Sequence, residues 1–101
     1  MSLIVLAVRQ GQYQFTVRGA GKQIDRLITD QEIEEVMVNG EIIEDYQEHY
    51  LGPACLILGW TSHGRPLHIV CSAKPVVDII TVYEPEPEEW EPDLRTRKAT
   101  R

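Results

Sequence analysis

Two apolar segments joined by a short polar turn constrain the fold of this chain more than any other feature. Ala54–Thr61 and Pro66–Ser72 are rich in Leu, Ile, Val and Cys, and Ser62–Arg65 (SHGR) between them is a hairpin signal. Successive side chains of a strand point to opposite faces, and here both alternate sets are apolar. We therefore expect helices on one face of the hairpin and either the C-terminal tail or a second subunit on the other.

The segment that follows the last apolar run is acidic, punctuated by prolines and contains a tryptophan. Ile80–Pro92 reads ITVYEPEPEEWEP, and a basic stretch ends the chain. Trp90 is the residue we expect to cover the hairpin if the tail provides the cover, whereas a homodimer or another protein partner is the alternative. We divide the single domain into a core of residues 2–84 and a tail of residues 85–101, acidic and then basic.

Local signals outside the hairpin predict an α+β fold, with N-terminal helices packed on an antiparallel β-meander. Thr29-Asp30-Gln31-Glu32 is a capping box, and the helix that it starts ends at Asn39-Gly40, with Gly40 expected in the left-handed conformation. The predicted order is helix Ser2–Gln10, strand Tyr13–Val17, helix Arg18–Leu27, the capping-box helix, and strands Glu41–Tyr46, Ala54–Thr61, Pro66–Ser72 and Val76–Tyr83.

Length and composition are those of one globular domain without a membrane span. The chain has 101 residues with 43% apolar content, and no apolar run approaches the ~20 residues that a span needs. The apolar start Met1–Val8 lacks the basic region and cleavage site of a signal peptide. We therefore expect a cytoplasmic protein that does not contact the membrane, with Cys55 and Cys71 as reduced, buried thiols. A three-residue turn would place these cysteines opposite each other, whereas a two- or four-residue turn would offset them.

The sequence predicts no cofactor and no metal. Gly19–Lys22 (GAGK) resembles part of a phosphate loop, but Thr16 and Gln23 stand where that motif has Gly and Ser or Thr. A zinc site that includes His68 and Cys71 is disfavoured, because residues three apart on a strand lie on opposite faces and no set of four ligands is present.

His68 is the first candidate for chemistry. It points to the face opposite Leu67 and Ile69, where an imidazole can transfer a proton or contact a ligand. The alternative is a structural histidine whose nitrogens are satisfied by hydrogen bonds. Tyr83, near the end of the last predicted strand, is the second candidate catalytic residue.

Arg18, Lys22 and Arg26 recur every four residues and form a basic row along one face of their predicted helix. Such a row can bind the phosphates of RNA or an acidic strip of a partner. The net charge of −6 disfavours RNA, since nucleic-acid binding depends on neutralising phosphates. The alternative for this row, as for the acidic block Asp30–Glu48 and the basic C-terminus, is solvated surface.

Several segments together resemble the bacterial family known as domain of unknown function 4258. They are Asn39–Tyr46 (NGEIIEDY), Gly52–Gly59 (GPACLILG), Arg65–Val70 (RPLHIV) and Ile80–Pro92 (ITVYEPEPEEWEP). The helix of this family usually carries His, Ala and Arg where this chain has Arg18, Gly19 and Lys22, whereas the strand histidine, His68, is retained.

The family is distantly similar to RelE-like and BrnT-like toxins, which implies helices packed on an antiparallel sheet and, for several of those toxins, RNA cleavage. In an mRNA-cleaving toxin, His68 and Tyr83 would be the catalytic residues. Arg18, Lys22 and Arg26 would then contact phosphates. The acidic charge and the absence of the helix histidine favour instead a degenerate relative that acts through protein–protein contacts.

Overall fold

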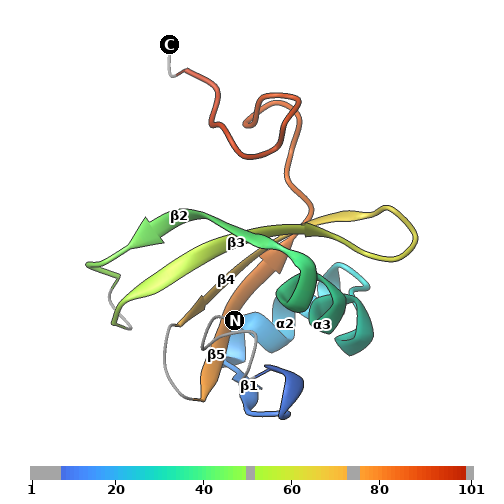
Figure 1. The fold of residues 1–101 in the computed structure, drawn as a ribbon, viewed down its shortest axis with the longest axis vertical. Coiled ribbons are helices and arrows are strands. Elements are labelled where there is room, and N and C mark those ends of the chain that lie inside the picture. Colours follow the sequence, from blue (N-terminus) through green and yellow to red (C-terminus); the bar gives the residue numbers. More distant parts are fainter. Residues whose placement is uncertain (1–7, 50–51, 73–75, 100–101) are drawn as a thin grey trace.

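The computed structural model describes residues 8–49, 52–72 and 76–99, which build an α+β fold around one five-stranded sheet (Figure 1). Two helices lie on one side of this sheet, and the C-terminal tail lies on the other. The elements are β1 (Tyr13–Phe15), α2 (Val17–Asp25), α3 (Asp30–Asn39), β2 (Glu41–Tyr46), β3 (Ala54–Trp60), β4 (Pro66–Ser72) and β5 (Val77–Tyr83).

The sheet contains the predicted antiparallel meander, but it is mixed as a whole because β1 adds a parallel pairing that was not predicted. Its order is β1-β5-β4-β3-β2, and the four strands from β2 to β5 form an antiparallel meander. The short strand β1 pairs with β5 in parallel, from Tyr13 opposite Val77 to Phe15 opposite Ile79. This pairing joins segments that are far apart in the chain, and no local sequence signal specifies it.

The start of α2 differs from the sequence prediction because of its cap. The helix predicted over Arg18–Leu27 begins at Val17, since the Thr16 side chain accepts a hydrogen bond from the Gly19 amide at 3.0 Å. The helix predicted over Ser2–Gln10 lies mostly outside the described residues.

The register of the hairpin places the two cysteines opposite each other. Thr61 N–H donates to the Arg65 carbonyl oxygen at 2.9 Å and closes a three-residue turn that contains Gly64 with φ +82°. Cys55 therefore pairs with Cys71, and their sulfur atoms lie 3.8 Å apart as free thiols. The hydrogen bond with the Cys55 thiol and burial raise the pKa of Cys71, and both cysteines are packed in the core.

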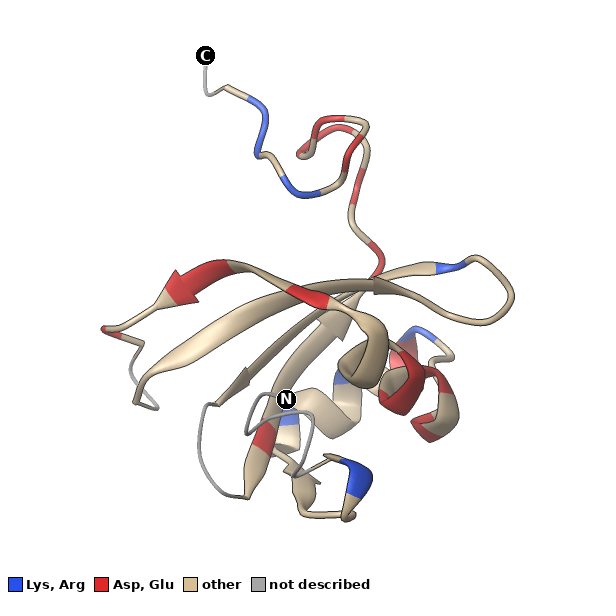
Figure 2. Ribbon diagram, in the orientation of Figure 1, with Lys and Arg blue, Asp and Glu red and all other residues tan. Residues whose placement is uncertain are grey.

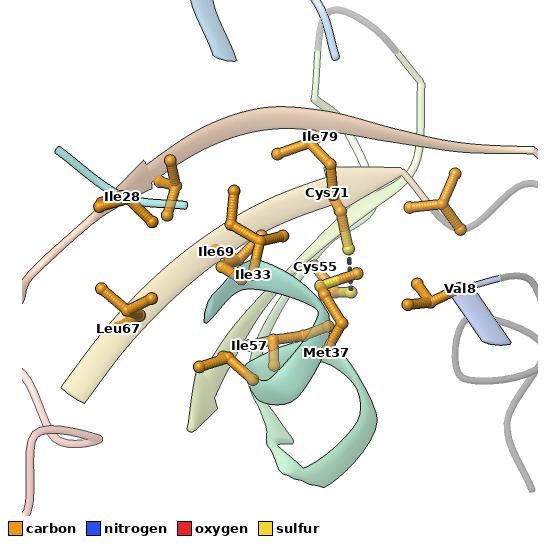
Figure 3. Packing of buried hydrophobic residues seen from close by; sticks show 13 residues of the cluster. Val8, Ile28, Ile33, Met37, Cys55, Ile57, Leu67, Ile69, Cys71 and Ile79 are labelled. Carbon is orange, nitrogen blue, oxygen red and sulfur yellow. Dashed lines mark hydrogen bonds between the residues drawn. The ribbon is translucent and has the colours of Figure 1, made fainter. Parts of the chain in front are cut away.

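The core on the helix side of the sheet is formed mainly by α3 and the central strands (Figure 3). The predicted capping box starts α3: the Thr29 hydroxyl accepts from the Glu32 amide, and the Glu32 carboxylate accepts from the Thr29 amide. The buried members of this core are Val8, Ile28, Ile33, Val36, Met37, Cys55, Ile57, Leu67, Ile69, Cys71, Val77, Ile79 and Val82.

Gly40 ends α3 in an extended conformation, with φ −82°, so its predicted left-handed conformation was wrong. The glycine is instead required by a close approach. A Cβ atom at this position would overlap the carbonyl oxygens of Val36 and Leu58, because the chain turns from α3 into β2 directly against β3.

The tail covers the second face of the sheet. Trp90 is 3% exposed and packs with Ala54, Leu56, Val70 and Ile80, which we call the tail-side cluster. Ile43, Tyr46 and Leu94 pack against its edge. Of the two covers expected from the sequence, the tail is the one that lies on this face in the described chain (Figure 1).

Gly19 allows helix α2 to pack closely against β5. A Cβ atom on Gly19 would overlap the Ile79 carbonyl oxygen, whereas a Cβ on Gly21 would meet no atom within 4 Å. A helix with Ala at position 19 would have to lie further from β5.

We therefore predict opposite effects for two matched substitutions in α2. Gly19→Ala should lower the free energy of unfolding by about 1–3 kcal/mol, as overpacking does. Gly21→Ala should raise it by roughly 0.5–1 kcal/mol, because alanine restricts the unfolded chain and suits a helix better. Urea titration of both variants measures this, and equal effects would contradict the packing of α2 on β5.

Candidate functional site

His68 lies at the centre of the best-defined polar cluster. It sits on β4 opposite Tyr83 of β5 and is 0% exposed. Its Nδ1 lies 3.2 Å from the Tyr83 hydroxyl oxygen, and its Nε2 lies 2.6 Å from the Leu94 carbonyl oxygen in the tail. The Trp90 ring packs perpendicular to the imidazole at 4.5 Å between centroids. The structure thus brings the two predicted catalytic residues together, and the tail covers His68.

The hydrogen bonds determine which nitrogen of His68 carries the proton. A carbonyl oxygen can only accept, so Nε2 donates to Leu94. In the neutral imidazole Nδ1 is then an acceptor, and the Tyr83 hydroxyl donates to it. Burial lowers the pKa of His68, although the Leu94 carbonyl and Glu44 act in the opposite direction. Burial also raises the pKa of Tyr83. Both residues are therefore neutral near pH 7, and both nitrogens of His68 are occupied.

Two arginines tie the tail to β2. Arg97 donates to both carboxylate oxygens of Glu44, at 2.8 and 2.9 Å, and its guanidinium lies 4.6 Å from the centre of the Trp90 ring. The hydrogen bond from Arg97 is the largest cause that lowers the pKa of Glu44. Arg95 also pairs with Glu41, through one carboxylate oxygen. These pairs were not predicted from the sequence, where solvated surface was the alternative for the acidic block and the basic C-terminus.

A hollow of about 280 Å³ opens beside Tyr83, and we call it the Tyr83 hollow. Arg26 contributes to it: this side chain donates to the Val82 carbonyl oxygen at 2.8 Å, and its guanidinium lies 6.0 Å from the centre of the Tyr83 ring. Three carboxylates line the hollow together with two arginines, so it is poorly suited to phosphate. Its lining residues are Arg26, Tyr83, Glu84, Glu86, Glu89, Trp90 and Arg97.

The basic row of α2 does not form one site. Arg26 lines the Tyr83 hollow, Arg18 lines a separate hollow, and Lys22 lines neither of them. Within the described parts of the chain, none of the three forms an ion pair with a carboxylate. By contrast, arginines elsewhere pair with glutamates, and Figure 2 shows the acidic residues concentrated on α3, β2 and the tail.

Helix α2 also presents large apolar side chains to solvent. Val17 is 93% exposed, Ile24 is 72% exposed, and Leu27, just after the helix, is 82% exposed with φ +53°. At 100° per residue, Val17 and Ile24 lie on the same side of the helix, two turns apart. Together with the row Arg18, Lys22 and Arg26, these side chains form what we call the α2 surface.

Residues 8–49, 52–72 and 76–99 contain neither a cluster of metal ligands nor a membrane-spanning helix. No group of three or more His, Cys, Asp or Glu side chains in these ranges is arranged to hold a metal ion. None of their helices combines the length and the apolar composition needed to cross a membrane.

Comparison with known proteins gives one match. The family model described as "Domain of unknown function (DUF4258)" matches residues 22–84, more than half of the chain. This region includes α3, the strands from β2 to β5, His68 and Tyr83, and it stops before the tail that carries Trp90. No curated protein and no solved structure matches the chain.

The buried, neutral state of His68 predicts a specific loss of stability in acid. Because its pKa is lower in the folded protein than in the unfolded chain, the unfolded chain takes up the proton first as the pH falls. The free energy of unfolding should therefore be undiminished above about pH 6.5 and should fall as the pH drops below this value. Urea titrations between pH 7 and pH 5 measure this slope.

The dependence of the free energy of unfolding on pH should be weaker in His68→Gln. It should be unchanged in His63→Gln, which alters an exposed turn. Long-range nitrogen–proton NMR correlations provide a second readout on the unmodified protein and should detect the Nε2–H tautomer of His68. An Nδ1–H tautomer, or equal slopes in the two variants, would contradict the hydrogen bonds described above.

Proposed function

The chain belongs to the DUF4258 family of domains of unknown function, and we propose that it acts by binding another protein through the α2 surface. The observation that carries this proposal is that the short helix α2 presents both exposed apolar side chains and cations that have no carboxylate partner among the described residues. The partner that fits is a segment with acidic and apolar side chains. Such a function makes the chain a binding module.

The apolar part of the α2 surface supplies the binding energy. Full burial of a Val, Leu or Ile side chain is worth roughly 1.5–3 kcal/mol, and three such side chains are largely exposed here. Exposed apolar side chains gathered in one patch are typical of an interaction site, whereas scattered ones need no explanation. Burial of Val17, Ile24 and Leu27 under a partner would therefore stabilise a complex.

The cations of the α2 surface indicate the charge of the partner. The chain has a net charge of −6, and yet Arg18, Lys22 and Arg26 have no carboxylate partner among the described residues. An acidic segment would neutralise them, accelerate association and select against basic partners. The contact should accordingly weaken with salt.

The dimensions of α2 favour a different protein over a second copy of this chain. A helix of nine residues is about 14 Å long. Two copies of such a short helix packed on each other would bury less than the ~1,200 Å² in total that a stable interface needs. A symmetric contact through α2 would also bring two identical rows of cations together. The second face of the sheet, for which a subunit was considered, already carries the tail.

The alternative function is cleavage of mRNA in the manner of RelE-like or BrnT-like toxins. It would require His68 or Tyr83 to reach a substrate, but His68 has no exposed surface and uses both nitrogens. The Tyr83 hollow also contains three glutamates, which would repel phosphates. These observations support the binding module over the nuclease.

The test uses a synthetic helical peptide with leucines on one face and glutamates on both flanks, together with a scrambled peptide of the same composition. In NMR titrations of the full chain, we expect the first peptide to shift the signals of residues 17–27 with a Kd of about 100 μM, which corresponds to about 5 kcal/mol. Ile24→Glu should weaken this binding by at least about tenfold. Ile42→Glu, which alters an isoleucine of β2 that is 54% exposed, should leave the Kd unchanged.

Four outcomes would overturn the proposal. Equal binding of the scrambled peptide, or an equal response of Ile24→Glu and Ile42→Glu, would show that the α2 surface is not selective. Light scattering that detects a dimer disrupted by Ile24→Glu would identify a second copy as the occupant. Cleavage of single-stranded RNA that is lost in His68→Gln would favour the toxin alternative.

A further inference from the structure

A second hollow of about 250 Å³ lies beside the first turn of α2, and we call it the Arg18 hollow. It lies on the tail side of the sheet, because Val70 and Ile80 belong to the tail-side cluster. Residues from α2, the end of β2 and the loop after it, β4 and β5 meet there. Its lining residues are Arg18, Tyr46, His49, Val70, Ile80 and Thr81.

The floor and the rim of this hollow differ in chemistry. Val70 and Ile80 are 9% and 4% exposed and form an apolar floor. Arg18 provides a guanidinium at the rim, and this group forms no ion pair with a described residue. No carboxylate lines the hollow among the described residues, unlike the Tyr83 hollow with its three glutamates. The Tyr46 hydroxyl is already bonded to Glu44 and Arg97.

We propose that the Arg18 hollow binds a small carboxylate that carries a short apolar group. A guanidinium matches the two oxygens of a carboxylate in a bidentate pair, and the apolar floor accepts the hydrocarbon part. A volume of about 250 Å³ is below that of most pockets for drug-sized ligands, so the ligand is a small molecule of a few carbon atoms.

This site shares Arg18 with the α2 surface proposed above but differs from it in its apolar part. One residue advances a helix by 100°, so Arg18 faces a different side of α2 from Val17 and Ile24. The ligand contacts Arg18 together with Val70 and Ile80 of the sheet, whereas the partner contacts Val17, Ile24 and Leu27. Ile24→Glu should therefore weaken binding of the partner peptide and leave binding in the Arg18 hollow unchanged.

The test is an NMR titration of the full chain with hexanoate and with hexanamide, which has the same hydrocarbon chain and no charge. Hexanoate should shift the signals of Val70, Ile80 and Thr81 with a Kd in the millimolar range, as expected for a ligand of this size. Hexanamide should bind at least about tenfold more weakly.

Two variants identify the cation that binds the carboxylate of hexanoate. Arg18→Gln should reduce hexanoate affinity to that of hexanamide, and Lys22→Gln, which removes a cation one turn away that does not line the hollow, should retain it. Arg18 is exposed, so an unchanged amide spectrum of Arg18→Gln outside the hollow verifies that the variant folds. Equal affinities for acid and amide, equal effects of the two variants, or no saturation by about 20 mM hexanoate would overturn the proposal.

Discussion

The need to bury both faces of the β3–β4 hairpin is the constraint on which the rest of the structure depends. Helix α3 covers one face, and the tail covers the other with Trp90. Because the second face is covered, His68 becomes an interior residue that shares its two nitrogens between Tyr83 and the Leu94 carbonyl. Burial keeps the imidazole neutral, so the residue that sequence analysis ranked first for chemistry instead fastens the tail to the sheet.

Some charged side chains on the surface form ion pairs with each other, whereas others have no such partner among the described residues. The basic end of the tail is held by acidic residues of β2, through Arg95 with Glu41 and Arg97 with Glu44. The cations of α2 have no such partners among the described residues, and the same short helix also carries exposed apolar side chains. We therefore propose the outer side of α2 and the Arg18 hollow, rather than the cluster around His68, as the regions that bind.

Local signals predicted the elements well, but long-range pairing was less accessible from sequence. The capping box at Thr29, strand Glu41–Tyr46 and the two hairpin strands follow from patterns within a few residues. The parallel pairing of β1 with β5 depends on contacts between distant segments, and the conformation of Gly40 depends on how closely β3 approaches. Arg97 and Glu44 are 53 residues apart in the chain, and they meet only because the tail folds back onto the sheet.

The most direct test of this account is the environment of Trp90, measured by fluorescence in a Trp60→Phe variant that leaves Trp90 as the sole tryptophan. Trp60 is 46% exposed, so this replacement should be tolerated. The account predicts a blue-shifted emission with little quenching by acrylamide under native conditions, and a red-shifted, readily quenched emission in urea. A native emission that already resembles that of the unfolded chain would show that the tail does not cover the sheet and would contradict the account.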